Sequence, residues 1–210
     1  MIRSDSRNKR AAKRRLGVIV TAAALAFVAG SAAGSGPAFP RGLIQDPPRL
    51  LPDVTLTNQN GSAVRLSELR GKWLWIFVGY TFCPDVCPTA LADVAREYDA
   101  LGPAKSGVRA VFLSVDPARD SADRLKEYVR HFHPDFIALT GQVEEIDRLV
   151  RALGARYNRK NAESAGGYLV DHTTYVHVVD PEGRLRARYS ASAEPGGLSG
   201  DFTFLKGEKP

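Results

Sequence analysis

The sequence predicts an α/β fold, and three observations support that prediction. Two continuous apolar runs, WLWIFVGY at 73–80 and VRAVFLSVD at 108–116, have the composition of strands that are buried on both faces of a sheet. Amphipathic helical patterns follow both runs, and strands that alternate with helices form an α/β sandwich. The 210-residue chain is 44% apolar and 25% charged, which is enough for one sizeable core.

The first 33 residues differ from the rest of the chain in charge and in hydropathy. Residues 1–15 contain seven Lys or Arg and one Asp, and residues 16–33 carry no charge. This pattern predicts a membrane-targeting segment, either a single-pass anchor in the cytoplasmic membrane or a signal peptide that is removed near the small residues at 33–35. In both cases we expect 1–15 to be a basic cytoplasmic tail, and the domain to face the periplasm or an equivalent extracytoplasmic space.

The formal net charge of +6 comes entirely from the basic tail, because the remaining residues hold 22 basic and 22 acidic side chains. A neutral body offers no basic surface for a phosphate backbone. We therefore expect a membrane contact through the N-terminal segment and no nucleic-acid partner.

The region after the membrane segment has no apolar periodicity. Residues 34–52 are rich in Gly and Pro, so we expect a linker there and place the domain at 53–190. The domain opens with DVTLTNQNGSAVRL, which alternates apolar and polar residues around Asn60-Gly61. That pair suits a tight turn, so we expect an N-terminal β-hairpin ahead of the first central strand.

Three segments have apolar residues at helical spacing, and each follows a predicted strand. The first segment ends at Gly102, the second precedes a short strand, FIALT at 136–140, and the third ends at Gly154. Their apolar faces consist of Leu91, Val94, Ala95, Tyr98 and Leu101, of Leu125, Tyr128, Val129 and Phe132, and of Ile146, Leu149, Val150 and Leu153.

Two further strands, TTYVHVVD and RLRARYS, are joined by a turn that has Pro181 at its second position, which predicts a C-terminal hairpin. Residues 191–210 contain Gly and Pro without a helical period, and we expect an irregular tail. An initial hairpin, a βαβ unit with cysteines just after its first strand, and a terminal hairpin are the arrangement of a thioredoxin-like fold.

The only two cysteines lie in GYTFCPDVCP at 79–88. Pro88 is best tolerated at the first helical position, so we expect a helix to begin there, with Cys87 at its N-terminus and Cys83 in the preceding loop. Free N–H groups and the helix dipole would stabilise a Cys87 thiolate. The spacing leaves open a structural disulfide, a redox couple or a metal site, although the small loop argues against a purely structural bond.

The chain has four histidines that could supply a third ligand. We expect His131 and His133, at the end of a helix, to be exposed, and His177 to be packed in the sheet. His172 precedes a strand, in a segment that can lie beside the cysteine loop, which favours a ligand over the alternative of a hydrogen-bonded loop histidine. Two thiolates and one imidazole suit Cu(I) and accommodate Cu(II), whereas zinc would need water as a fourth ligand.

Four motifs resemble those of one protein family: GYTFCPDVCPTAL at 79–91, LSVDPARDSADRLKEYV at 113–129, FIALTG at 136–141 and VDHTTYVHVVDPEG at 170–183. Together they resemble the SCO/SenC family of copper-handling proteins, which are required for assembly of cytochrome c oxidase. The resemblance covers 53–190. After Tyr189 the family usually continues into a closing helix, and the tail of this chain departs from that pattern.

The resemblance implies a thioredoxin-like domain that binds one copper ion per chain through Cys83, Cys87 and His172. It also implies delivery of copper to the binuclear centre of cytochrome c oxidase subunit II or another copper acceptor, or reduction of the cysteines of that centre. Because only reduced cysteines bind a metal and the compartment is oxidising, we also expect a thiol reductant as a partner. Asp116 and Asp171 fall inside family motifs, where they could support the site, dock a partner, or simply cap a helix and form a turn.

Three functions follow from these residues. The first is a membrane-tethered copper metallochaperone, which is not an enzyme in the strict sense. The second is a thiol–disulfide oxidoreductase that uses Cys83 and Cys87, with Cys83 as the more exposed sulfur. The third is an interaction domain with a structural disulfide, and a copper sensor on the same site is a further alternative.

Overall fold

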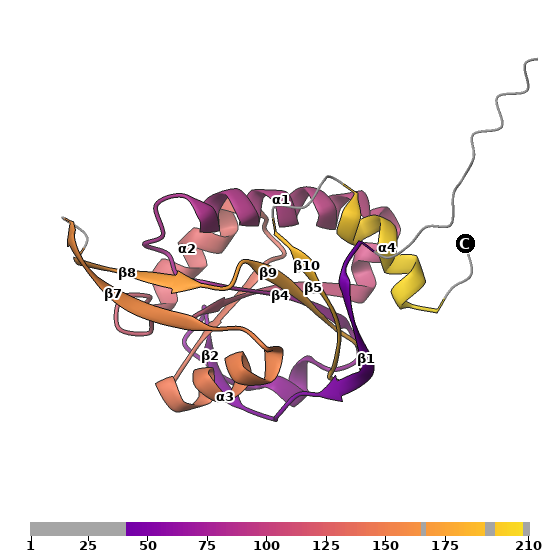
Figure 1. Ribbon diagram of the computed structural model, residues 1–210, viewed down its shortest axis with the longest axis horizontal. Helices are drawn as coiled ribbons and strands as arrows, with labels where there is room; N and C mark the ends of the chain where they lie inside the picture. The colour runs from indigo at the N-terminus through magenta and orange to yellow at the C-terminus, as the bar shows by residue number, and fades with distance from the viewer. Residues whose placement is uncertain (1–40, 165–166, 192–195, 208–210) are drawn as a thin grey trace, which may run out of the picture. The chain divides into compact units, whose positions relative to one another are not determined.

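The computed structural model describes residues 41–164, 167–191 and 196–207 (Figure 1). The predicted basic tail at 1–15 and membrane segment at 16–33 lie outside these ranges. Among the residues described, no helix has the length and apolar character needed to cross a membrane.

In the described part of the chain, eight strands form one mixed sheet in the order β1-β10-β9-β4-β5-β6-β2-β3, and β7 and β8 form a separate two-stranded sheet. The strands are β1 (Leu43–Leu50), β2 (Thr55–Asn58), β3 (Ala63–Arg65), β4 (Trp73–Gly79), β5 (Val108–Ser114), β6 (Ile137–Thr140), β7 (Tyr157–Ser164), β8 (Gly167–His172), β9 (Tyr175–Val179) and β10 (Arg184–Ser190).

The helices cover both faces of the large sheet. They are α1 (Val86–Ala100), α2 (Ala122–Phe132), α3 (Val143–Leu153) and α4 (Gly197–Leu205). Figure 1 shows α1, α2 and α4 on one side of the sheet and α3 on the other. The predicted α/β fold is therefore confirmed.

The centre of the sheet is built from the two apolar runs. All seven residues of β4 are buried, and β4 pairs in parallel with β5 and antiparallel with β9. Gly79 at the end of β4 pairs with Ser114 at the end of β5. The segments that follow these two strands therefore emerge next to each other at one edge of the sheet.

The prediction of a linker over 34–52 was wrong for its second half. Residues 43–50 form β1, which pairs antiparallel with β10 at the edge of the sheet. Seven of the eight side chains of β1 are exposed, so the strand lacks the apolar alternation on which sequence-based prediction depends. Pro47 and Pro48 lie where the register shifts, and an edge strand tolerates residues without an N–H group.

The prediction of an irregular tail over 191–210 was also wrong, because 197–205 form α4. The Phe202 ring packs edge-on against Trp73 and Trp75, with centroid distances of 5.4 and 5.9 Å. The chain therefore does continue into a closing helix after the last strand.

Tertiary contacts, rather than helix propensity, hold α4 in place. Glu97 of α1 accepts hydrogen bonds from the backbone N–H and the hydroxyl of Ser199, at 2.8 and 2.7 Å. A nine-residue helix that contains two glycines is marginal by itself. A sequence pattern does not show a cap that comes from a residue about a hundred positions earlier.

Candidate metal centre

The connection from β4 to α1 positions both cysteines. Cys83 lies in the loop and Cys87 lies in the first turn of α1, which begins at Val86. The prediction that this helix begins at Pro88 was therefore wrong by two residues. Pro88 is still tolerated, because N–H groups in the first turn have no acceptor within the helix.

Gly79 leaves the space into which the Cys87 side chain packs. A Cβ atom at position 79 would lie 2.9 Å from the Cys87 sulfur and 2.8 Å from the Phe112 ring. Real Cβ atoms do not approach heavy atoms this closely, so glycine is required here by close packing. The end of β4 thus sets the position of the buried sulfur.

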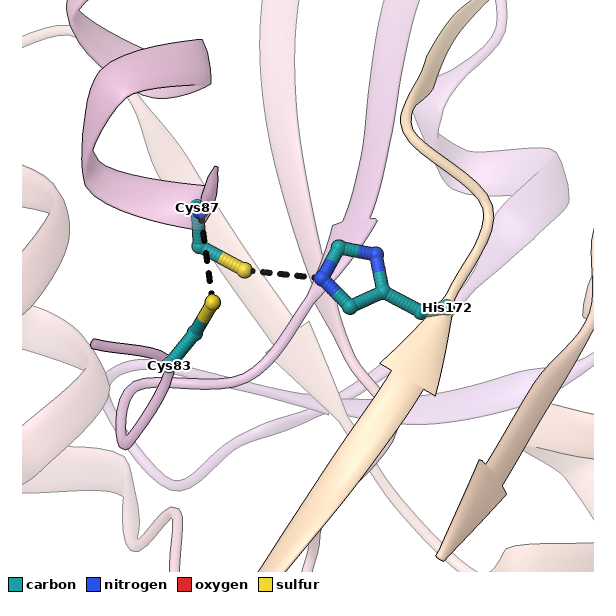
Figure 2. A group of neighbouring side chains, drawn as sticks. All are labelled: Cys83, Cys87 and His172. Atoms are coloured by element: carbon teal, nitrogen blue, oxygen red, sulfur yellow. Dashed lines mark hydrogen bonds between the residues drawn. The ribbon is translucent and has the colours of Figure 1, made fainter. Parts of the chain in front are cut away.

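His172 is the last residue of β8 and points toward the two sulfurs (Figure 2). Its Nε2 atom lies 3.0 Å from the Cys87 sulfur, and its Nδ1 atom lies 3.1 Å from the carbonyl oxygen of Thr173. Because a carbonyl only accepts hydrogen bonds, Nδ1 carries the ring proton and Nε2 presents its lone pair to the sulfurs. The ligand atoms of Cys83, Cys87 and His172 all lie within 4.8 Å of one another.

The two cysteines differ in burial as we predicted, with Cys83 the more exposed, but they differ in acidity in the opposite sense to our prediction. Cys87 is fully buried and Cys83 is half-buried, and no disulfide joins them. A hydrogen bond from the Cys87 thiol lowers the pKa of Cys83, and the same bond, followed by burial, raises the pKa of Cys87. The thiolate is therefore on Cys83, not on Cys87 as predicted.

The N-terminus of α1 does stabilise a thiolate, but on Cys83 rather than on Cys87. The backbone N–H of Cys87 donates to the Cys83 sulfur at 3.3 Å, so the start of α1 points at the loop cysteine (Figure 2). The single thiol proton of Cys87 faces two acceptors, the Cys83 sulfur and Nε2 of His172. Removal of that one proton leaves three electron-pair donors that converge on one point.

The other three histidines lie apart from this group. His131 is exposed, as predicted, but His133 is buried: its ring packs against Tyr98 at 5.1 Å between centroids and its Nε2 atom lies 3.3 Å from Asp99. His177 is fully buried in β9, as predicted, and burial lowers its pKa to about 4.

The two aspartates inside the recognised motifs have different surroundings. Asp171 is exposed and pairs with Lys160. Asp116 is fully buried and accepts hydrogen bonds from Arg119 and from the hydroxyl of Tyr168. Sequence reasoning missed Arg119 and Tyr168. For Arg119 there was a signal, because in DPARD it lies three residues after Asp116 and could reach back to it.

The donor set restricts which metal the site would hold. Two sulfurs and one imidazole nitrogen are soft ligands, and no fourth His, Cys, Asp or Glu joins the group among the residues described. Cu(I) accepts three soft ligands, whereas a closed zinc site needs four. The residues therefore fit copper better than they fit structural zinc.

Comparisons with known proteins agree with this geometry. The sequence model of the SCO1/SenC family matches residues 44–202. A SCO2-like protein of Rickettsia felis is 34% identical over 156 residues, which cover 74% of this chain and 75% of that protein. The residues that the family model matches include most of β1 and most of α4, the two elements whose prediction was wrong.

Two similar solved structures hold copper. The crystal structure of Arabidopsis thaliana ScoI with copper bound is 32% identical, with a TM-score of 0.70 over 76% of this chain and 99% of that one. The structure of Bradyrhizobium japonicum ScoI with copper bound is 34% identical, with a TM-score of 0.67 and the same coverage. These matches confirm the predicted thioredoxin-like fold.

Proposed function

The chain belongs to the SCO1/SenC family, and we propose that it is a copper metallochaperone that holds one copper ion through Cys83, Cys87 and His172. The observation that carries this proposal is the convergence of two sulfurs and one imidazole nitrogen within 4.8 Å, from segments 85 residues apart in the sequence. Two similar structures that have copper bound, those of ScoI from Arabidopsis thaliana and from Bradyrhizobium japonicum, support it.

The unequal cysteines suggest how copper would enter and leave. Cys83 is already a thiolate and is the more accessible sulfur, so it would meet an incoming Cu(I) ion first. Cys87 binds after its proton has gone to solvent, so uptake of copper releases one proton. Transfer to an acceptor would proceed by stepwise replacement of these ligands, in which the accessible sulfur exchanges before the buried one.

The N-terminal pattern supports a membrane location for this activity. We place the domain on the outer face of the cytoplasmic membrane, attached by the segment at 16–33. The acceptor would be cytochrome c oxidase subunit II or another copper-accepting protein. Because the metal needs free thiolates and the periplasm is oxidising, a thiol reductant is the third partner of this proposal.

A second function is favoured by the acidity of Cys83. A low-pKa sulfur beside a buried thiol is the arrangement of a thiol–disulfide oxidoreductase. The Cys83 thiolate would attack a partner disulfide and release one partner thiolate. Cys87 would then lose its proton and attack the Cys83 sulfur, which releases the second partner thiolate and leaves the Cys83–Cys87 pair oxidised until the reductant returns two electrons.

An anaerobic Cu(I) titration against a competing chelator tests the first function. The reduced full-length chain should bind one Cu(I) tightly, and His172→Ala should weaken binding by at least about tenfold because a ligand is lost. His131→Ala, a change at an exposed histidine outside the group, should leave the affinity unchanged. Weak binding by the unaltered chain, or equal binding by His172→Ala, would contradict the proposal and direct attention to the reduction potential of the cysteine pair.

A further inference from the structure

We propose that Arg119 is a positioning residue of the metal centre, because it joins the hairpin that carries His172 to the loop that carries Cys83. Arg119 lies in the segment between β5 and α2. This role rests on the proposed copper site, and it explains what keeps His172 close to the two cysteines of that site.

The hairpin needs such an attachment. β7 and β8 pair with each other and, among the strands described, with no strand of the large sheet. At its β7 end the hairpin is attached to α3 by a hydrogen bond of 2.6 Å from the Tyr157 hydroxyl to Asp147. The position of the β8 strand over the sheet therefore depends on side-chain contacts, among them the buried Val170, and on the short connection from His172 to β9.

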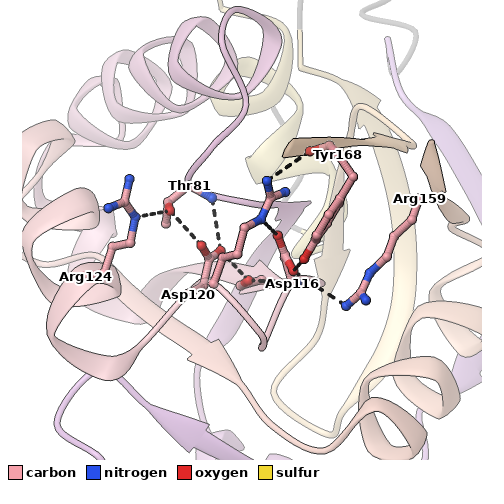
Figure 3. A network of polar contacts seen from close by, with 8 residues as sticks. Thr81, Asp116, Asp120, Arg124, Arg159 and Tyr168 are labelled. Atoms are coloured by element: carbon pink, nitrogen blue, oxygen red, sulfur yellow. Dashed lines mark hydrogen bonds and ion pairs between the residues drawn. The ribbon is translucent and has the colours of Figure 1, made fainter. Parts of the chain in front are cut away.

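Arg119 provides those contacts on the hairpin side. Its Nη1 atom donates to the backbone carbonyl of Tyr168 at 2.9 Å, and its guanidinium carbon lies 3.7 Å from the centroid of the Tyr168 ring. The Tyr168 hydroxyl donates to Asp116 (Figure 3). Asp116 also accepts from Arg119 Nε at 2.5 Å. Backbone, ring and hydroxyl of one residue of β8 are thus all held, four residues before His172.

The same guanidinium faces the cysteine loop. It lies 4.7 Å from the centroid of the Phe82 ring, and Arg124 lies 3.9 Å from that ring. Phe82 directly precedes Cys83. Cation–π contacts of this kind stabilise by about 0.5–2 kcal/mol each, more when they are shielded from water.

A second aspartate fixes the start of the loop from the same segment. Asp120 accepts from the backbone N–H of Thr81 at 3.0 Å and from its hydroxyl at 2.6 Å, and Ser114 donates to Asp120 at 2.6 Å (Figure 3). The segment after β5 therefore holds the cysteine loop through Asp120 and the hairpin through Arg119. Because these two residues are adjacent in sequence, the loop and the hairpin are placed relative to one rigid segment.

Burial gives the Arg119–Asp116 pair its strength. The side chains are 15% and 0% exposed, so the pair is shielded from solvent, unlike a surface ion pair. Removal of one partner of a buried pair leaves an uncompensated charge, and Arg159, at 3.6 Å from Asp116, offers only a longer contact. We therefore expect Arg119 to restrict the hairpin far more than an exposed arginine would.

The position of the hairpin determines the position of the third ligand. His172 is within hydrogen-bond distance of Cys87 and ends the strand that Arg119 holds. Release of Tyr168 would let the imidazole move away from the sulfurs without disturbing either cysteine. The loss expected for a residue that orients a metal ligand through another group is about 10- to 100-fold in affinity.

The test is a double-mutant cycle on Cu(I) affinity with the reduced full-length chain. Arg119→Gln should weaken Cu(I) binding about 10- to 100-fold in the otherwise unaltered chain, but less than about twofold in a His172→Ala background, because its effect passes through His172. Arg119→Lys keeps the charge and should recover only part of the loss, since lysine lacks the planar fork.

The control is Arg184→Gln, which removes a more exposed arginine from another buried aspartate. Arg184 Nε donates to Asp180 at 2.7 Å in the turn between β9 and β10, away from the cysteines. This variant should lose stability and keep the affinity for Cu(I). Tyr168→Phe, which removes only a hydroxyl, provides a milder test if Arg119→Gln does not fold.

A second measurement needs no metal. In the copper-free reduced chain, amide hydrogen exchange at 168–172 should be faster in Arg119→Gln than in Arg184→Gln, whereas exchange in α1 should be equal. Equal exchange at 168–172, equal Cu(I) affinity in these two variants, or an additive cycle with His172→Ala would each overturn the inference. Absence of copper binding by the unaltered chain would instead overturn the proposed function, and hydrogen exchange would still decide the role of Arg119.

Discussion

The two halves of the metal centre are supported in different ways. Cys83 and Cys87 come from the turn between the fully buried strand β4 and helix α1, so the backbone of the central sheet positions them. His172 comes from a two-stranded sheet that is separate from the large one, and side chains hold it there. The cysteine half is thus part of the fold, whereas the histidine half is attached to it.

This difference suggests that the two halves contribute differently to the affinity for copper. Backbone hydrogen bonds and close packing leave the cysteine half little freedom, so it can keep hold of a metal ion. A hairpin held by a few side chains opens at a lower free-energy cost than a central strand does. We therefore expect the sulfurs to dominate the affinity for copper and the imidazole to adjust it.

The largest effect should come from Cys83→Ser. Loss of this thiolate should reduce Cu(I) affinity by more than the roughly 100-fold that loss of a supporting residue costs. Because the side chain is half-buried and serine is of similar size, we expect the free energy of unfolding to change by only about 1 kcal/mol. Chelator competition and denaturant unfolding measure the two quantities. If His172→Ala weakened binding more than Cys83→Ser, the proposed order of the two halves would be reversed.

A smaller effect is expected from Gly79→Ala, which disturbs the cysteine half through packing alone. The added methyl would overlap the Cys87 sulfur and the Phe112 ring, so we expect a loss of about 1–3 kcal/mol in stability and a lower Cu(I) affinity. Gly107→Ala is the control, because no heavy atom lies within 4 Å of the added group. Unfolding curves and chelator competition would show equal behaviour of both variants if β4 did not set the position of the sulfur.

The smallest effect on copper is expected at His177, which lies five residues after His172 but inside the large sheet. Burial lowers its pKa to about 4, below the ordinary value of about 6.5. Between these values the unfolded chain binds a proton that the folded chain does not, so stability should fall as pH falls from about 6.5 to about 4.

His177→Leu should reduce that pH dependence and leave Cu(I) affinity at neutral pH unchanged. The measurement is denaturant unfolding of the copper-free chain across the acid range. His131→Leu is the control, since this side chain is exposed in the folded as well as in the unfolded protein. A pH dependence that is identical in His177→Leu and the unaltered chain would show that His177 is not the group responsible.

The difference between the cysteine half and the histidine half also explains which parts of the structure could be predicted from the sequence. The cysteine half rests on local signals: a continuous apolar run, a Pro near the start of a helix and a helical period ended by Gly. Those signals located β4, α1 and both cysteines. They did not show which cysteine keeps its thiol proton, because the helix N–H points at Cys83 only once the loop has folded back. The motif that contains His172 was recognised, while the hairpin that carries it was not.

What sequence reasoning missed depends on contacts between distant residues. The segment YNRKNAESAGGYLVDH is polar and lacks alternation, because its hairpin lies outside the large sheet and is attached through a few side chains, among them Tyr157, Tyr168 and the buried Val170. Strand β1 is exposed along an edge, and α4 depends on a cap from Glu97. None of these contacts has a local periodicity from which it could be read.

The separation of the ligands along the chain has a consequence for unfolding of the loaded protein. Cys83 and Cys87 are four positions apart, whereas 85 positions separate Cys87 from His172. To keep all three ligands, an unfolded chain would have to close a long loop, at an entropic cost of about 4–5 kcal/mol by analogy with a crosslink of that span. An unfolding chain would therefore release the imidazole and retain copper on the two sulfurs. Copper then stabilises the fold only by the share of its binding free energy that the histidine contributes.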